Sequence, residues 1–207
     1  MPDVTLRRSA PAKLNLGLHV LRLRADGYRD IETVFLPIAW HDTITARPSH
    51  TLTLSCSDPD LPTDECNLVL RAALKLNSVL GGQHGAELHL DKQLPYGAGL
   101  GSGSSDAAHT LRLLCALWEV DVHRTQLESI AVELGSDVAF FLDDEPAFAT
   151  GRGERLSTLS DREGGGAYRC PFAIVVAAPH VHVDTGEAYA LVAPNGTDRP
   201  DLRAVVR

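Results

Sequence analysis

Glycine occupies every second position from Gly97 to Gly103, and this is the stretch whose residue types most clearly suggest chemistry. Glycine accepts a left-handed backbone and lets an anion come close to the main chain. An alternating segment at 86–91 precedes the glycines, and a capping-type cluster, Ser104 to Asp106, leads into apolar residues at helical spacing as far as Trp118. A strand, a glycine loop and a helix in this order direct free N–H groups and the positive end of a helix dipole at one point. The stretch therefore predicts a phosphate-binding loop.

Several better-known loops do not fit this stretch. A flexible linker would not lie between a strand and a long helix. The Walker pattern needs a lysine, and none occurs between Gly97 and Trp118. The dinucleotide pattern G-x-G-x-x-G fails because its last glycine falls on Ser102 or Ser104, and the nucleophile elbow G-x-S-x-G has no match. The loop must then belong to another phosphate-binding class.

Two charged residues far from the loop are candidates for catalysis. Lys13 and Asn15 lie on one face of a strictly alternating segment at 13–21, and Asp137 comes just before an apolar run. From spacing alone, the first two residues suit a solvated strand face as well as a site. Asp137 by itself also suits the N-cap of a helix.

Composition restricts the function further. The chain has 207 residues, 44% of them hydrophobic and 22% charged, so it can form one large domain or two small ones. A net charge of −8 and a pI near 5.5 argue against a general nucleic-acid or membrane-surface binder. The four cysteines have no C-x-x-C spacing, and neither a signal peptide nor a membrane-length apolar run occurs. These features predict a cytoplasmic protein with reduced thiols.

A metal site is not expected, because His180 and His182 could share a face but no third ligand is evident.

The order of predicted elements mixes strands and helices. Alternation and turn signals predict strands at 5–9, 13–21, 31–39, 43–46, 51–55, 86–91 and 147–150, and a buried strand at 172–178. Helical periodicity predicts helices at 67–80, after the glycine loop, and near 123–134, with another helix starting at 185. Residues 195–207 give no clear signal.

The loop, written P-x-x-x-G-L-G-S-G-S-S-x-A-A over 95–108, resembles the second motif of the galactokinase, homoserine kinase, mevalonate kinase and phosphomevalonate kinase superfamily, the GHMP kinases. Three more segments narrow this resemblance to the 4-diphosphocytidyl-2-C-methyl-D-erythritol kinases. They are Ala-Pro-Ala-Lys-Leu-Asn-Leu at 10–16, Ala-Asp-Gly-Tyr at 25–28 with Glu-Thr-Val-Phe at 32–35, and Leu-Gly-Ser-Asp-Val-Ala-Phe-Phe at 134–141. The similarity spans residues 9–192, including a weaker segment at 185–189.

The resemblance implies ATP-dependent phosphorylation of the 2-hydroxyl of 4-diphosphocytidyl-2-C-methyl-D-erythritol in non-mevalonate isoprenoid biosynthesis, with Mg²⁺ bridging the phosphates. It makes Lys13 and Asp137 the catalytic pair, in which Asp137 takes the hydroxyl proton and the ammonium favours the ionised carboxylate. The implied substrate-binding residues are Asn15, Tyr28, Arg29, Thr185 and Tyr189. The implied ATP-binding residues are Pro95, Tyr96, Gly97, Ala98, Gly99, Leu100, Gly101, Ser102, Gly103, Ser104 and Ser105.

Two positions differ from the usual pattern of this family. Arg29 stands where histidine is usual, so recognition of the cytosine can differ because arginine donates hydrogen bonds but cannot accept them. Ala139 stands where proline is usual.

The resemblance also implies an α+β two-domain GHMP kinase fold in a monomer or a homodimer. Residues 1–155 would form the ATP-binding domain, similar to ribosomal protein S5 domain 2. Residues 156–207 would begin a ferredoxin-like domain that is incomplete, because the third glycine-rich motif of the family does not occur in this sequence. Two alternatives remain: a GHMP kinase that acts on another small alcohol, and a non-catalytic nucleotide-binding remnant.

Overall fold

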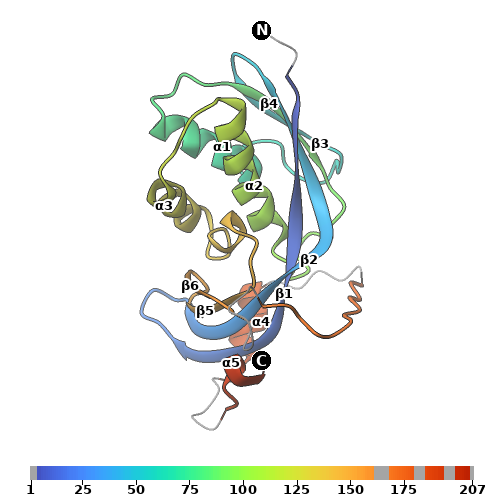
Figure 1. Ribbon diagram of the computed structural model, residues 1–207, viewed down its shortest axis with the longest axis vertical. Helices are drawn as coiled ribbons and strands as arrows, with labels where there is room; N and C mark the ends of the chain where they lie inside the picture. Colours follow the sequence, from blue (N-terminus) through green and yellow to red (C-terminus); the bar gives the residue numbers. More distant parts are fainter. Residues whose placement is uncertain (1–3, 161–167, 180–184, 194–198, 206–207) are drawn as a thin grey trace.

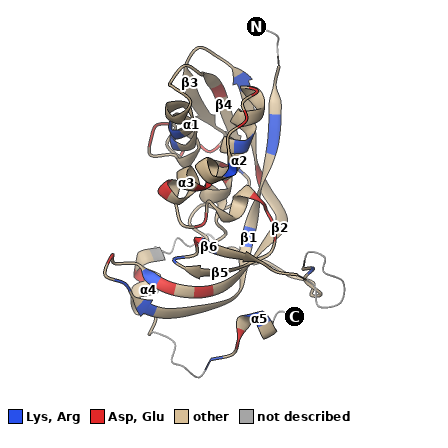
Figure 2. Ribbon diagram, turned by 60° about the vertical axis from the view of Figure 1, so that its left-hand side comes forward, with Lys and Arg blue, Asp and Glu red and all other residues tan. Residues whose placement is uncertain are grey.

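The computed structural model describes residues 4–160, 168–179, 185–193 and 199–205 (Figure 1). It is an α+β structure in which helices cover one face of the upper part of a six-stranded sheet. The sheet continues below the helices, where its lower strands lie beside the C-terminal segments. Basic and acidic residues are interspersed over both parts of the molecule (Figure 2).

One long hairpin runs the length of the molecule (Figure 1). Strand β1 (Leu6–Leu23) pairs antiparallel with β2 (Arg29–Pro48). The turn between them has Gly27 at φ +82°, where glycine carries no Cβ penalty. The sequence predicted two shorter strands on each side of this turn, and that was wrong. Register shifts at 11/13, 15/18 and 20/22 bend β1 without ending it, because a β-bulge absorbs an extra residue while pairing resumes beyond it.

Strand β2 organises the rest of the sheet. Its C-terminal half, Thr43 to Pro48, pairs with β4 (Ala86–Asp91), and its N-terminal half, Ile31 to Phe35, pairs with β5 (Ala147–Gly151). Strand β3 (Leu52–Cys56) runs parallel to β4, and β6 (Arg155–Thr158) follows antiparallel to β5. The parallel β3–β4 pair requires a crossover, which contains helix α1.

The helices bury their apolar faces on the upper sheet. They are α1 (Leu68–Val79), α2 (Ser102–Leu117), α3 (Arg124–Leu134) and the short 3₁₀ helix η1 (Phe140–Leu142). The Asn67 side chain caps α1 by accepting from Val69 N at 2.9 Å. Completely buried side chains such as Leu76, Leu111 and Phe141 form the main core between these helices and the sheet. None of the helices in the described ranges is long and apolar enough to cross a bilayer.

The C-terminal part differs from expectation. Residues 172–178 do not form the predicted buried strand, and Phe172 and Val175 are 70% and 95% exposed. Their apolar sequence favours a strand, but a strand also needs ladder bonds to a neighbour, and this segment enters no sheet. Helix α4 (Thr185–Leu191) forms as expected. The short α5 (Leu202–Val205) was not predicted, and it buries Leu202 against the lower sheet.

Candidate active site

Three of the four alternating glycines take the left-handed conformation that the sequence suggested, and the fourth, Gly103, lies inside α2. Gly97, Gly99 and Gly101 have φ of +71°, +73° and +69°. Gly101 is also the N-cap of α2 and makes no side-chain capping bond. The Ser104–Asp106 cluster therefore does not cap the helix, because α2 already begins at Ser102. The first amides of α2 keep their donors for a ligand, which is how a helix N-terminus binds an anion.

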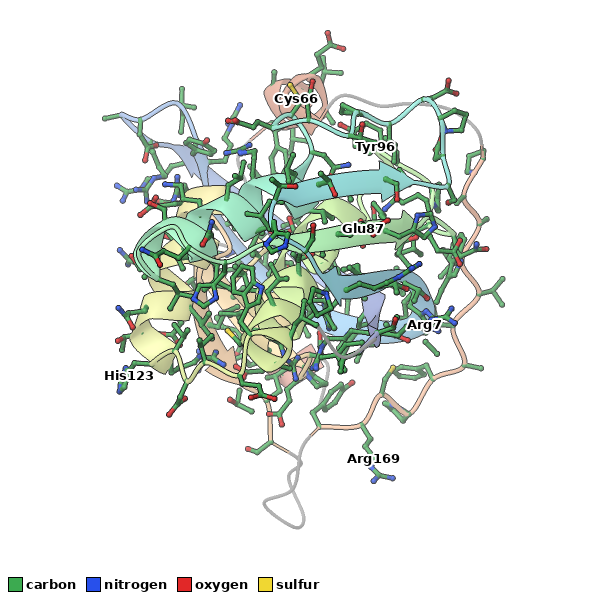
Figure 3. The ribbon with its side chains drawn as sticks, turned by 90° about the horizontal axis from the view of Figure 1, so that it is seen from above. Arg7, Cys66, Glu87, Tyr96, His123 and Arg169 are labelled. Carbon is green, nitrogen blue, oxygen red and sulfur yellow. The ribbon has the colours of Figure 1, made fainter. Side chains whose placement is uncertain are left out.

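The rim of the loop is accessible. Tyr96 is 67% exposed, and Figure 3 shows it on the side of the molecule opposite His123, which is the N-cap residue of α3.

A buried ionic cluster joins the two ends of the loop. Lys92 Nζ lies 2.5 Å from Asp42 Oδ2 and 2.9 Å from Asp106 Oδ2. Asp42 Oδ1 also accepts from Gln93 N at 2.6 Å and from Leu94 N at 2.8 Å. The three charged side chains are nearly inaccessible to solvent. Lys92 therefore ties the strand that enters the loop to the helix that leaves it, a connection that the sequence analysis missed.

The protonation of this cluster is unusual. Burial, helped by the charge of Asp42, raises the pKa of Asp106 to about 7 despite the opposing effect of Lys92. Burial lowers the pKa of Lys92, but the carboxylates of Asp106 and Asp42 outweigh it, so the net pKa is raised. Asp42 accepts three hydrogen bonds, whereas Asp106 Oδ1 is buried and has no hydrogen-bond partner among the described residues. The raised pKa of Asp106 favours its protonated form up to a higher pH than is usual for an aspartate.

Lys13 contacts the glycine loop through both its backbone and its side chain. Its amide donates to Leu100 O at 2.9 Å, next to the irregularity in β1 between Pro11 and Lys13. Its ammonium donates to Asn15 Oδ1 at 2.8 Å and to Gly99 O at 3.1 Å, and it lies 5.1 Å from the centre of the Phe35 ring. Lys13 is only 6% exposed, so its face of β1 is not the solvated face that spacing alone allowed.

Asp137 completes the group of contacts around the ammonium. Asp137 Oδ2 lies 3.4 Å from Lys13 Nζ, and the Asp137 side chain is 26% exposed. Asp137 lies in the turn between α3 and η1, and the N-cap of η1 is Ala139, so Asp137 does not cap this helix. Folding therefore brings together a carboxylate and an ammonium that are far apart in the sequence, next to the glycine loop.

The β5–β6 turn also lies against Asp137, a contact that was not predicted from the sequence. Gly153 has φ +115°, and a Cβ there would lie 3.3 Å from Asp137 Oδ1 and 3.5 Å from Phe35 Cζ. The neighbouring Arg152 holds its guanidinium 4.8 Å from the centre of the Tyr28 ring. Tyr28 thereby contacts the residue that precedes Gly153. The closely spaced Gly151 and Gly153 were the sequence signal for this turn.

The remaining predicted residues are less closely connected to the pair. Tyr189 in α4 is near enough that the charge of Asp137, after burial, raises the pKa of its phenol. Arg29 begins β2 opposite Leu23, and no described contact joins its side chain to Lys13 or Asp137. Thr185 begins α4, and its side chain lies outside the described residues, as do His180 and His182. Within the described ranges, no three His, Cys, Asp or Glu side chains cluster as metal ligands.

The chain is similar to known proteins in both sequence and fold. Residues 67–151 match the family model of the GHMP kinases N terminal domain. The structure resembles a solved homoserine kinase from Cytophaga hutchinsonii, with 21% identity and a TM-score of 0.59 over 100% of this chain and 64% of that one. At this identity the likeness shows the fold alone. The fold, the glycine loop and the matched domain define the class of protein as a GHMP kinase.

Relatives of higher sequence identity show which family of GHMP kinases the chain belongs to. The 4-diphosphocytidyl-2-C-methyl-D-erythritol kinase of Salinibacter ruber is 57% identical over 97% of this chain and 70% of its own length. The enzyme of the same name from Chlorobium luteolum is 41% identical over 99% of this chain and 69% of its own length. A solved 4-(cytidine 5'-diphospho)-2C-methyl-D-erythritol kinase, also 41% identical, has a TM-score of 0.65 and covers 75% of this chain and 55% of its own. The chain belongs to the 4-diphosphocytidyl-2-C-methyl-D-erythritol kinase family.

Proposed function

We propose that this chain phosphorylates the 2-hydroxyl of 4-diphosphocytidyl-2-C-methyl-D-erythritol from ATP, a step of non-mevalonate isoprenoid biosynthesis. The observation that carries this proposal is the 3.4 Å approach of Lys13 Nζ to Asp137 Oδ2, while the same ammonium donates to Gly99 O. An acid–base pair is thereby tied to a loop that suits phosphate. The names of the relatives supply the choice of alcohol.

The loop fits the phosphates of a nucleotide. Its left-handed glycines and the uncapped start of α2 leave main-chain amides to donate to phosphate oxygens. Gly101 leaves no room for a side chain, since a Cβ there would come within 3.0 Å of Phe141 and 3.1 Å of Lys13. Residues 95–105 would hold the phosphates of ATP, and ATP supplies the γ-phosphoryl group. Mg²⁺ would be held chiefly by phosphate oxygens, as this ion commonly is.

The pair performs the proton chemistry. Asp137 accepts the proton of the 2-hydroxyl as the hydroxyl oxygen attacks the γ-phosphoryl group of ATP. Lys13 stabilises the negative charge that develops as this group passes from ATP to the alcohol. A positioned carboxylate contributes about 10²–10⁴-fold, and phosphoryl transfer depends even more on position and charge. Asn15 holds the substrate near the pair and holds the ammonium through its Oδ1.

The aromatic and basic residues that the resemblance implies suit a pyrimidine diphosphate. Tyr28 stacks on the cytosine, and Tyr189 supplies a second aromatic face. Arg29 and Thr185 contribute polar contacts. Arg152, already stacked on Tyr28, adds a positive charge at the same place.

The division into a catalytic part, 1–155, and the start of a substrate-side part, 156–207, belongs to this proposal. A cytoplasmic location and a monomeric or homodimeric state belong to it as well.

ADP release by the chain and by Asp137→Asn tests the proposal. We expect the variant to lose at least about 10²-fold in rate because an amide cannot accept the proton. Asp60→Asn removes an exposed carboxylate in a loop and should leave the rate unchanged. Equal rates for wild type and Asp137→Asn would remove Asp137 from the mechanism. Turnover of mevalonate or homoserine without turnover of the cytidylyl substrate would assign another alcohol.

A further inference from the structure

A series of hydrogen bonds connects Lys13 to a buried hydroxyl, and in each of them the group nearer to Lys13 is the donor. Lys13 Nζ donates to Asn15 Oδ1 at 2.8 Å, Asn15 Nδ2 donates to Thr33 Oγ1 at 2.7 Å, and Thr33 Oγ1 donates to Gly17 O at 2.6 Å. Thr33 is completely buried in β2, so water does not compete for its hydroxyl. These contacts link the ammonium beside Asp137 to the backbone of β1.

The two ends of this series fix the roles of the groups between them. An ammonium can only donate, and a carbonyl oxygen can only accept. Thr33 has one hydroxyl hydrogen, and the Gly17 carbonyl takes it. Thr33 can therefore only accept from Asn15, so the NH₂ end of the Asn15 amide must face Thr33. Its oxygen then faces Lys13.

The opposite orientation of the Asn15 amide would be unfavourable at both ends. Its NH₂ group would face the ammonium, which has no acceptor to offer. Its oxygen would face a hydroxyl whose only hydrogen is already used. Both groups would lose a hydrogen bond where little water can replace it, which disfavours this orientation.

A β-bulge makes the Gly17 carbonyl available. Asn15 pairs with Phe35 and Leu18 pairs with Thr33, so two residues of β1 lie opposite the single residue Val34 of β2. A bulge disrupts the ladder locally, and this frees a carbonyl to accept from a side chain. This bulge, which the sequence did not predict, thus supplies Gly17 O, the last acceptor in the series of hydrogen bonds.

We propose that Thr33 is a positioning residue for the phosphoryl transfer, because its hydroxyl orients the amide of Asn15 and thereby holds the Lys13 ammonium beside Asp137. The inference rests on the proposed function. The three acceptors around the ammonium are Asn15 Oδ1, Gly99 O at 3.1 Å and Asp137 Oδ2 at 3.4 Å. Of these three, Asn15 Oδ1 is the acceptor that a flip of its amide would replace with a donor, and Thr33 holds that amide in the required orientation.

Thr33→Val removes the hydroxyl and keeps the shape of the side chain, while Thr33→Ser keeps the hydroxyl. We expect kcat to fall about 10- to 100-fold in Thr33→Val, as a small misplacement of catalytic groups can cause, with the Kd for ADP unchanged. Thr33→Ser should remain near the wild-type rate. If Thr33→Val does not fold, the comparison of Thr33→Ser with Thr33→Ala replaces it. A wild-type rate in the variant without the hydroxyl would overturn the proposal.

A double-mutant cycle separates positioning from general destabilisation. If Thr33 acts through Asn15, adding Thr33→Val to Asn15→Ala should cause no further loss of kcat, whereas independent effects would multiply. Multiplying effects would refute the proposal.

A measurement without turnover keeps this test distinct from that of the proposed function. In wild-type protein, NMR should detect a nuclear Overhauser effect between the Asn15 side-chain NH₂ protons and the Thr33 γ-methyl group. A wild-type chain without kinase activity that still shows this signal would refute the function and leave the orientation standing. Absence of the signal in an active enzyme would refute the orientation alone.

Discussion

Replacement of Asp106 by asparagine should change how the stability of the protein depends on pH. Burial raises the pKa of Asp106 from 3.8 to about 7. The folded state therefore keeps a proton that the unfolded chain releases between about pH 4 and pH 7. Stability from this proton is fully present below the unfolded pKa, and it is lost as pH rises towards 7. Wild-type stability should fall over this window, and Asp106→Asn should not show that fall.

The size of the effect follows from the shift. A difference of about three pKa units, at about 1.36 kcal/mol each, gives a total of about 4 kcal/mol over the whole window. Between pH 5 and pH 8 this corresponds to about 2–3 kcal/mol, because part of the fall lies below pH 5. The side-chain amide in Asp106→Asn would mimic the neutral acid, so the variant and wild type should be similar at pH 5. At pH 8 the variant should be the more stable by about that amount.

Urea unfolding at pH 5, 6, 7 and 8 measures this difference for wild type and variant. Other groups titrate equally in both proteins, so only the difference in unfolding free energy is interpreted. Asp60→Asn, at an exposed acid, serves as the control and should give a difference that does not vary with pH. A difference for Asp106→Asn that stays constant, or that favours wild type as pH rises, would show that the buried cluster does not hold a proton.

Two further substitutions test other parts of the site. Gly153→Ala should lower kcat about tenfold without changing the Kd for ADP, because the new Cβ would lie 3.3 Å from Asp137 Oδ1. Gly81→Ala is the control, since Gly81 also has a positive φ but a Cβ there would meet no other atom. It should destabilise the protein without lowering kcat. Equal kinetics in the two alanine variants would contradict this. Lys92→Met should lower the free energy of unfolding, measured in urea at pH 8, by about 3–5 kcal/mol, because it leaves two buried acids without their cation. Lys75→Met removes the cation of an exposed pair with Glu133 and should change this free energy by less than about 1 kcal/mol. Similar losses of stability in the two methionine variants would show that the buried cluster contributes no more than a surface pair.

Local patterns in the sequence predicted the helices and the loop well. The period of apolar residues located α1 and α3 to within about a residue at each end, and alternating glycine predicted the left-handed backbone at Gly97, Gly99 and Gly101. These features depend on neighbours in the sequence. The cap of α2 was mistaken because Ser104 to Asp106 have capping chemistry, but the helix already begins at Ser102.

Features that depend on distant contacts were not predictable in this way. The continuous strands β1 and β2 were predicted in pieces, with gaps at 10–12 and 40–42, and the irregular pairing between Pro11 and Lys13 lies at these gaps. The apolar run at 172–178 looked buried, but burial requires a partner that a sequence pattern does not identify. The contacts of Lys92 with Asp42 and of Gly153 with Asp137 join separate elements and carry no local signal.

The position of the ammonium illustrates why the catalytic pair requires the whole sheet–helix unit. Lys13 is 6% exposed, and removing an ammonium from water is unfavourable unless its donors are satisfied. It donates hydrogen bonds to acceptors in β1 and in the glycine loop, and it forms an ion pair with Asp137 in the turn after α3. These segments are held together by one core, so the ammonium cannot follow one acceptor without losing another. It follows that the distance from Lys13 to Asp137 depends on how the turn between α3 and η1 packs against the sheet.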